Sequence, residues 1–233
     1  MASVLNNMPS VIVFDVNETL SDMSPMKARF VEIGAPAYLA QVWFASLLRD
    51  GFAVAATAGS ATFAVIGASI LRDVLRDVHV NMALEDAVRH VMGGMAQLNV
   101  HPDIAPGILS LKRSGFRLVT LSNGAAQVAE TLLTKAEIRD HFDALLTVED
   151  APVWKPARAA YDYAAHFCGV EQADMMLVAV HPWDIHGAAQ AGLRTAWLNR
   201  NGAVYPSYFA APDYTSDSLS ELATQLGSPL GSV

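Results

Sequence analysis

Cysteine is nearly absent from this sequence, with Cys168 the only one in 233 residues. One cysteine excludes an internal disulfide framework and a metal site built from several thiolates, and it favours a reducing, cytoplasmic location. Charge is also scarce, at 16% of residues, and 15 basic against 23 acidic residues give a net charge of −8. This balance argues against nucleic acid and anionic membrane surfaces as partners.

Signals for secretion or membrane insertion are also weak. Met1 to Ser10 has no basic region before an apolar run, so a secretory signal is not predicted. The tract from Gly51 to Leu71 holds 21 uncharged residues, but it is rich in Ala, Gly, Ser and Thr, which favours a buried helical hairpin or a subunit interface over a membrane span. Together with Trp43 and Phe44, this tract suggests apolar surface that pairs two chains, and we expect a homodimer.

What the sequence does contain is apolar residues, at 52%, arranged in short β-rich runs without alternation. Such runs are typical of parallel strands that are covered on both faces. Helical patterns lie between them, and three of these end at glycine. The alternation predicts an α/β fold, a doubly wound, Rossmann-like parallel sheet. The predicted strands are 11–14, 116–121, 143–148, 175–180 and 195–198, and the predicted helices 106–114, 125–136, 157–168 and 185–191, with a last extended piece and helix within 213–226.

The interval from Ser21 to about Asn99 breaks this alternation. It has helical periodicity and no clear strand, so we expect a helical insertion after the first strand (residues 21–99, hereafter the helical insertion). Residues 1–20 and 100–233 would then form one α/β core domain, and the insertion a second, helical domain.

Polar residues follow the predicted strands at the points where those strands end. In an open parallel sheet, ligands bind beyond the carboxyl ends of the strands. We therefore expect carboxylate, hydroxyl, amide and ammonium groups to converge at one edge of the sheet. The residues are Asp15, Asn17, Thr19, Ser122, Asn123, Trp154, Lys155, His181, Trp183 and Asp184.

Four tracts in this order resemble the motifs of the haloacid dehalogenase superfamily, and the insertion resembles that superfamily's cap. The tracts are FDVNETL (14–20), LSNG (121–124), Lys155 with Pro156, and Trp183-Asp184 followed by Gly187-Ala188. The resemblance extends from Val11 to Asn201 and is closest to the L-2-haloacid dehalogenases, whose pattern the tracts 155–161, 180–184 and 197–202 also resemble.

The residues separate the branches of that superfamily. Its phosphatases use a second aspartate two positions after the nucleophile as a general acid, but position 17 is Asn17. The tract from His181 to Asp184 holds a single acid, which serves Mg²⁺ poorly. A halide needs neither a proton nor a metal to leave, so we expect no metal and no cofactor. A phosphatase and a non-catalytic binding protein stay as alternative hypotheses.

The resemblance implies hydrolytic dehalogenation of small 2-haloacids. Asp15 would displace the halide from C2, and water would hydrolyse the resulting aspartyl ester to a 2-hydroxy acid. Lys155 would hold Asp15, Asp184 would fix Lys155 and activate the water, and Thr19 and Ser122 would bind the substrate carboxylate with backbone amides near Val16 and Asn123. The other residues assigned to substrate binding are Asn17, Trp43, Phe44, Tyr161, His181 and Trp183, with Asn123 also facing the leaving group.

Several of these residues also have simpler interpretations. Lys155 could be a surface lysine, Asp184 an N-cap, and Tyr161 a core residue. His181 stands where the family usually has asparagine; it could assist water activation, or it could be a neutral histidine that satisfies backbone groups.

The main departure from the family is Phe44, which aligns with a halide-binding arginine. Arg29 and Arg49 are near in sequence, but the pattern identifies neither as a replacement. The loss of that arginine leaves the substrate open. Another small carboxylic acid hydrolysed through the same ester, such as azetidine-2-carboxylate with its strained ring, is the alternative.

Overall fold

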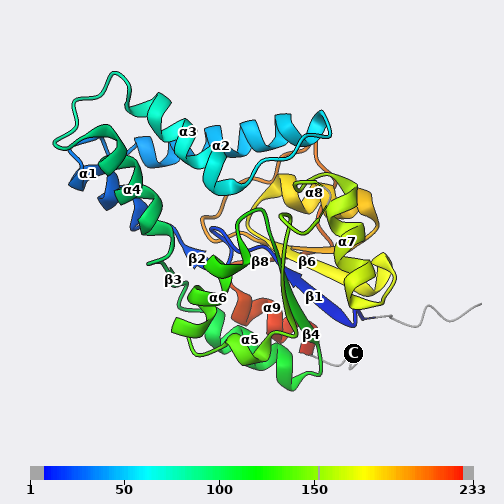
Figure 1. The fold of residues 1–233 in the computed structure, drawn as a ribbon. Coiled ribbons are helices and arrows are strands. Elements are labelled where there is room, and N and C mark those ends of the chain that lie inside the picture. Colours follow the sequence, from blue (N-terminus) through cyan, green and yellow to red (C-terminus); the bar gives the residue numbers. More distant parts are fainter. Residues whose placement is uncertain (1–7, 152, 228–233) are drawn as a thin grey trace, which may run out of the picture.

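A computed structural model of the chain describes residues 8–151 and 153–227, and its core is a parallel sheet (Figure 1). Six strands lie in the order β5-β4-β1-β6-β7-β8, and every neighbouring pair is parallel. The α/β class with a doubly wound sheet is therefore confirmed. The strands are β1 (Val11–Phe14), β4 (Arg117–Ser122), β5 (Ala144–Thr147), β6 (Met175–Ala179), β7 (Arg194–Leu198) and β8 (Tyr214–Ser216).

Helices cover both faces of this sheet. Ile12 and Phe14 of β1 belong to the apolar cluster that includes the helices on one face, whereas Val11 and Val13 point to those on the other. This explains why β1 is a continuous apolar run with no exposed side chain. The first face carries α5 (Ile104–Arg113), α6 (Ala126–Lys135) and α9 (Leu219–Gly227), and the second α7 (Arg158–Cys168) and α8 (Pro182–Ala191); 3₁₀ turns lie at Arg139–His141 and Gln172–Asp174.

The helix ends agree with the sequence pattern, with one difference at α8. Gly169 and Gly192 end α7 and α8 in left-handed conformations, with φ of 66° and 98°, which glycine adopts without strain. Helix α8 begins at Pro182, three residues before the predicted start, because proline fits the first turn of a helix. His181 is the N-cap of α8, so the interpretation of Asp184 as an N-cap is wrong.

The segment between β1 and the rest of the core forms four helices, which Figure 1 shows across the top and upper left of the molecule. They are α1 (Met26–Glu32), α2 (Leu39–Ala56), α3 (Phe63–Leu75) and α4 (Leu84–Met95). The expectation of no strand here is wrong in detail: β2 (Ser21–Asp22) pairs antiparallel with β3 (Asn99–Val100) at the base of the insertion. Two-residue strands are too short to produce a periodic pattern.

The predicted uncharged tract forms the end of α2 and the start of α3, which pack on each other as a helical hairpin. No helix in the described part of the chain is long and apolar enough to cross a membrane. Trp43 is fully buried in the insertion, and its indole N–H donates to the Gly67 carbonyl at 3.0 Å. Phe44 is only 7% exposed. A single chain therefore covers both aromatics, which corrects their interpretation as open apolar surface.

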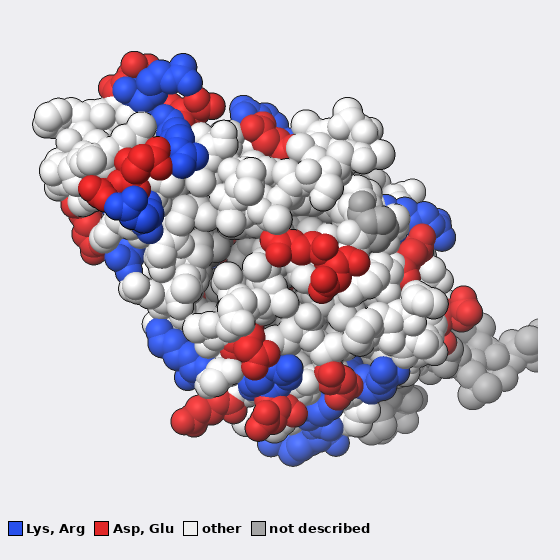
Figure 2. All heavy atoms as spheres, in the orientation of Figure 1, with Lys and Arg blue, Asp and Glu red and all other residues white. Residues whose placement is uncertain are grey.

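Charged side chains are unevenly distributed over the face in Figure 2. Lys and Arg lie in small groups beside Asp and Glu, mainly on the insertion and along the lower edge, and they form no continuous basic area on this face. The surface between these groups is largely uncharged.

Candidate active site

Asp15 follows the last residue of β1 and is held from several directions. Its backbone N–H donates to the Val178 carbonyl at 3.1 Å, which continues the pairing with β6 by one residue. Its Oδ1 accepts from the Lys155 ammonium at 3.0 Å, and its Oδ2 accepts from the Thr19 hydroxyl at 2.6 Å. The side chain is thus a fixed carboxylate at the carboxyl end of the central strand.

Lys155 is fully buried and lies between two carboxylates. Its ammonium donates to Asp184 Oδ2 at 2.6 Å as well as to Asp15. The interpretation of Lys155 as a surface lysine is therefore wrong. The Asn123 side chain fixes its backbone, accepting from the Lys155 N–H at 3.0 Å and donating to the Lys155 carbonyl at 3.2 Å. Asn123 thus fixes the backbone of the lysine through both the oxygen and the nitrogen of its amide.

Asp184 has both carboxylate oxygens occupied by protein donors. Lys155 donates to Oδ2, and the Tyr161 hydroxyl donates to Oδ1 at 2.6 Å; all three side chains are fully buried. Tyr161 thus packs in the core and is bonded into the network at the same time. These bonds position Asp184 to hold Lys155.

The electrostatics of the pair follow from burial and charge. Burial acts to raise the pKa of Asp15, but Lys155, His181 and Thr19 outweigh it and lower that pKa below its ordinary value. Burial raises the pKa of Asp184, and the charge of Asp15 adds to this, against the opposing effect of Lys155. Burial opposes the charge on Lys155, yet both carboxylates raise its pKa. Asp15 is therefore the carboxylate kept anionic, beside a charged ammonium.

The resemblance implies that Thr19 binds the substrate carboxylate, whereas the structure shows its hydroxyl bonded to protein groups. Its hydroxyl donates to Asp15 and accepts the Val180 N–H at 3.1 Å, and the side chain is fully buried. The hydroxyl hydrogen is used on Asp15 and is not available to a substrate carboxylate. Ser122 accepts the Gly124 N–H at 2.9 Å, which leaves its own O–H to donate.

His181 lies between two carboxylates. Its Nδ1 is 3.0 Å from Asp15 Oδ2, and its Nε2 is 2.8 Å from Glu18 Oε2. Burial acts to lower the pKa of His181, but the bonds to Asp15 and Glu18 raise it to about 9. The interpretation as a neutral histidine that satisfies backbone groups is therefore wrong.

Aromatic side chains surround His181. The Phe44 ring centroid is 6.4 Å from the His181 ring, and Trp183 stacks on it at 5.1 Å. Trp183 also meets Phe52 of α2 at 4.9 Å, so the insertion contacts the core here. Trp43 does not reach the core site, since it is buried in the insertion.

Neither arginine near Phe44 in sequence replaces the family's halide-binding arginine among the contacts that the structure shows. Arg29 bonds His90 and Gln97 within the insertion. Arg49 pairs with Asp50 on the surface.

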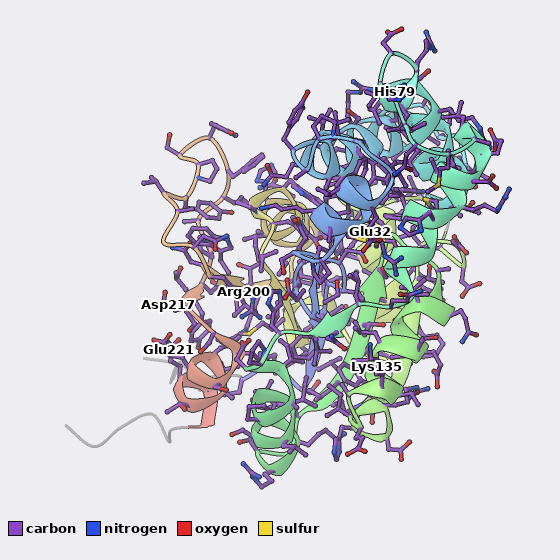
Figure 3. The ribbon with its side chains drawn as sticks, turned by 90° about the vertical axis from the view of Figure 1, so that its left-hand side faces the viewer. Glu32, His79, Lys135, Arg200, Asp217 and Glu221 are labelled. Atoms are coloured by element: carbon purple, nitrogen blue, oxygen red, sulfur yellow. The ribbon has the colours of Figure 1, made fainter. Side chains whose placement is uncertain are left out.

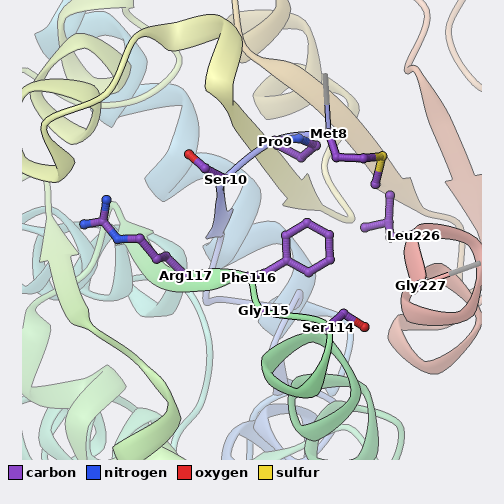
Figure 4. Close-up of a pocket in the computed structure, with 9 residues that line it drawn as sticks. All are labelled: Met8, Pro9, Ser10, Ser114, Gly115, Phe116, Arg117, Leu226 and Gly227. Atoms are coloured by element: carbon purple, nitrogen blue, oxygen red, sulfur yellow. The ribbon is translucent and has the colours of Figure 1, made fainter. Parts of the chain in front are cut away.

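A small apolar pocket adjoins this network. It has a volume of about 200 Å³ and lies between the insertion and the core. Apolar side chains of α3, α4 and α6, and of the residues next to these helices, form most of its wall. Val16, Asn17 and Ser122 line its core side. A larger hollow of about 480 Å³, shown in Figure 4 with Pro9, Phe116 and Leu226 among its walls, lies at the opposite, amino end of β1 and β4.

Two residues in this region were not predicted from the sequence. Glu18 contacts His181, and it adopts a φ of 62°, which no sequence signal reveals. Arg200 donates to the Thr19 carbonyl at 3.1 Å and pairs with Asp103 at 2.7 Å. Figure 3 shows Arg200 within the α/β core, below the insertion that carries Glu32. The tract around Arg200 matched the family pattern, and this match is the signal that identifies it.

The donor set does not suit Mg²⁺. Within residues 8–151 and 153–227, no group of three or more His, Cys, Asp or Glu side chains is arranged to hold a metal ion. The ammonium of Lys155 lies between Asp15 and Asp184, and Asn17 offers an amide in place of a second carboxylate.

A family model for haloacid dehalogenase-like hydrolases matches residues 9–192. The chain belongs to this family. The match spans every tract that builds the site except the segment around Arg200.

Individual relatives agree with the family. The chain is 32% identical over 143 residues to an (S)-2-haloacid dehalogenase of Pseudomonas sp. (strain YL), an alignment that covers 60% of this chain and 61% of that protein. It is 28% identical over 214 residues to (S)-2-haloacid dehalogenase 4A of Burkholderia cepacia, covering 90% and 91%. For several of the matched relatives, the alignment with this chain covers less than two thirds of the relative's own length.

Solved structures are similar over nearly the whole chain. A dehalogenase solved with an intermediate complex superposes with a TM-score of 0.88 at 26% identity, covering 96% of this chain and 99% of that one. An L-2-haloacid dehalogenase gives 0.87 at 26% identity, covering 95% and 100%. These likenesses include the helical insertion as well as the core.

Proposed function

We propose that this protein hydrolyses the carbon–halogen bond of small 2-haloacids through an ester on Asp15. The observation that carries the proposal is the buried trio of Asp15, Lys155 and Asp184, joined at 3.0 and 2.6 Å. Attack on an sp³ carbon needs an anionic nucleophile in a fixed direction. The lowered pKa of Asp15 and the donors on both of its oxygens meet that need.

The side chain at position 17 is compatible with a halide as the leaving group. A halide departs as a stable anion, so no acid is needed at position 17, where Asn17 stands. Relatives named (S)-2-haloacid dehalogenases support the substrate class. A similar structure of a dehalogenase with an intermediate complex supports a reaction that passes through an intermediate.

The pocket beside Ser122 indicates how the substrate lies. Its apolar wall suits the alkyl group on C2, and the free O–H of Ser122 can donate to the substrate carboxylate. With Phe44 in place of an arginine, we assign the carboxylate to Ser122 and to backbone N–H groups after β1 and β4. The helical insertion acts in this proposal as a cap domain that closes the pocket.

The test is a screen without added metal of short 2-haloacids of both chiralities, fluoroacetate and azetidine-2-carboxylate. We expect halide release from 2-haloacids, a mass adduct on the Asp15 peptide, and incorporation of ¹⁸O from solvent water into Asp15 over many turnovers. Asp15→Asn should abolish all three. Opening of the azetidine ring, without halide release from any 2-haloacid, would change the assigned substrate and keep the ester chemistry. Mg²⁺-dependent phosphate release, or full activity of Asp15→Asn, would overturn the proposal.

A further inference from the structure

The two carboxylate oxygens of Asp15 have different surroundings. Among the described residues, Oδ1 accepts a hydrogen bond from Lys155 alone. Oδ2 accepts from the Thr19 hydroxyl at 2.6 Å and faces His181 Nδ1 at 3.0 Å. The Val180 N–H donates to the Thr19 oxygen, and this bond directs the hydroxyl hydrogen to Oδ2. Two polar groups, Thr19 and His181, therefore face Oδ2, whereas Lys155 alone faces Oδ1.

We propose that Thr19 and His181 stabilise the oxyanion that forms on Asp15 Oδ2 when water attacks the ester, and that Glu18 holds the His181 ring for this role. The inference rests on the proposed function, because it concerns the second step of that reaction. His181 would be a catalytic residue, since its Nδ1 contacts a reacting atom, and Glu18 a positioning residue that acts through His181.

The bonds that form and break assign a role to each oxygen. Oδ1 bonds to C2 while the halide leaves with the bonding electrons, so Oδ2 becomes the carbonyl oxygen of the ester. Water then bonds to Cγ, and the carbonyl electrons move to Oδ2 as an oxyanion. When the carbonyl reforms, the Cγ–Oδ1 bond breaks and Oδ1 leaves with C2. One water proton goes to the released alkoxide and the other to solvent, so the product is a 2-hydroxy acid.

The surroundings of His181 favour a donor over a base. Both ring nitrogens face carboxylates, Asp15 on one side and Glu18 on the other, so each nitrogen carries a proton and neither can accept one from water. The other groups against the ring, Phe44 and Trp183, are uncharged. In the free protein, Asp15 and Glu18 raise the pKa of His181 to about 9. When Asp15 loses its charge in the ester, the pKa of His181 falls, but the carboxylate of Glu18 still favours the protonated ring.

His181 also contacts the residue that departs from the family's arginine. Phe44 packs against the His181 ring, so the two departures from the family pattern are neighbours in space. The ion pairs here join three carboxylates with two cationic groups, which leaves one excess negative charge. The carboxylates belong to Asp15, Glu18 and Asp184, and the cations to Lys155 and His181. Without the proton on His181, an anionic substrate would meet two excess negative charges in this network instead of one.

The first experiment measures the two chemical steps separately with (S)-2-chloropropionate. Rapid quenching and mass spectrometry of the Asp15 peptide follow the ester in the wild type, His181→Ala, His181→Asn and the control His186→Asn. His186 lies in α8, the helix that His181 caps, and its ring contacts Phe209 and the Ala210 N–H and not Asp15. In His181→Ala we expect the ester to form and its hydrolysis to slow about 10²–10³-fold, so that the ester accumulates. His181→Asn keeps a donor and should retain more of the rate, and the control should match the wild type.

The second experiment tests Glu18 through the pH dependence of ester hydrolysis. In the wild type the rate should fall as the pH rises and His181 loses its proton. In Glu18→Gln that fall should move to lower pH, towards the ordinary histidine value of 6.5, while the rate well below 6.5 stays close to the wild type. The fall should be absent in His181→Asn. A merely structural role for Glu18 would lower the rate equally at every pH.

The outcomes separate this inference from the proposed function. If wild-type turnover places ¹⁸O in Asp15 but His181→Ala does not accumulate ester, the oxyanion role is wrong and the proposed function stands. A hydrolysis rate that rises as His181 loses its proton would identify the ring as a base and overturn the inference. If the wild type forms no ester on any substrate of the screen, both proposals fail together.

Discussion

At the scale of single residues, the site depends on buried groups that complete one another's hydrogen bonds. Tyr161→Phe removes the hydroxyl that donates to the fully buried Asp184 Oδ1. We expect a loss of about 1–3 kcal/mol in the free energy of unfolding, because a buried acceptor is left without its donor. Catalytic rate should fall as well, since Asp184 then holds Lys155 less firmly. Urea unfolding and halide release measure the two effects.

The control for this change is Tyr163→Phe, on the same helix. Tyr163 is partly exposed and bonds no group of the site in the described contacts. Equal effects of the two substitutions on stability and on rate would show that the Tyr161 hydroxyl has no special role.

At the scale of elements, α8 packs closely on the segment that carries Lys155. A Cβ on Gly187 would lie 2.6 Å from the Tyr161 hydroxyl and 2.8 Å from the Pro156 carbonyl oxygen. Gly187→Ala should therefore destabilise the fold by about 1–3 kcal/mol and reduce activity, because backbone must shift beside the lysine. Gly93→Ala in α4 is the matched control: nothing lies within 4 Å of its Cβ, so the helix should gain about 0.5–1 kcal/mol. Thermal unfolding of both variants measures the contrast, and Gly187→Ala at or above wild-type stability would contradict it.

The elements also show what sequence reasoning reaches and where it stops. Apolar runs and glycine exits predict the strands and most helices, because burial on both faces and left-handed helix ends leave direct marks on composition. The strand-end rule predicts that Asp15, Lys155 and Asp184 meet. It does not predict which partner each polar group takes, such as the bonds of the Thr19 side chain to Asp15 and of the Asn123 side chain to the Lys155 backbone. The Glu18 contact depends on a backbone conformation that a sequence pattern does not encode.

At the scale of the whole molecule, the raised pKa of His181 makes stability depend on pH. A group whose pKa is raised by folding contributes stability that is complete below its ordinary value of 6.5 and is lost as the pH rises through about 9. The difference in unfolding free energy between the wild type and His181→Asn should therefore be largest near pH 6, at up to about 3 kcal/mol, and should disappear above pH 9. Denaturant titrations across this range measure it, and a constant difference would contradict the assignment.

Assembly is the second question at this scale. We propose a homodimer formed through the helical insertion, where the exposed large apolar residues are Val31, Tyr38, Val42, Val65 and Leu84. Sedimentation equilibrium should then give twice the chain mass of 24.9 kDa. Tyr38→Glu with Val65→Glu should return the monomer mass without loss of fold. A wild-type monomer at micromolar concentration would rule the dimer out.

The indole of Trp154 joins the insertion to the core, at the residue that precedes Lys155. Its N–H donates to the Ala61 carbonyl at 2.9 Å, its ring fills the space that the absent side chain of Gly51 leaves open, and the next residue along the chain is Lys155. The insertion cannot swing away from the core without exposing this ring to water. Trp154 is therefore an intrinsic fluorophore, adjacent in sequence to Lys155, and its emission would change if the insertion moved away from the core.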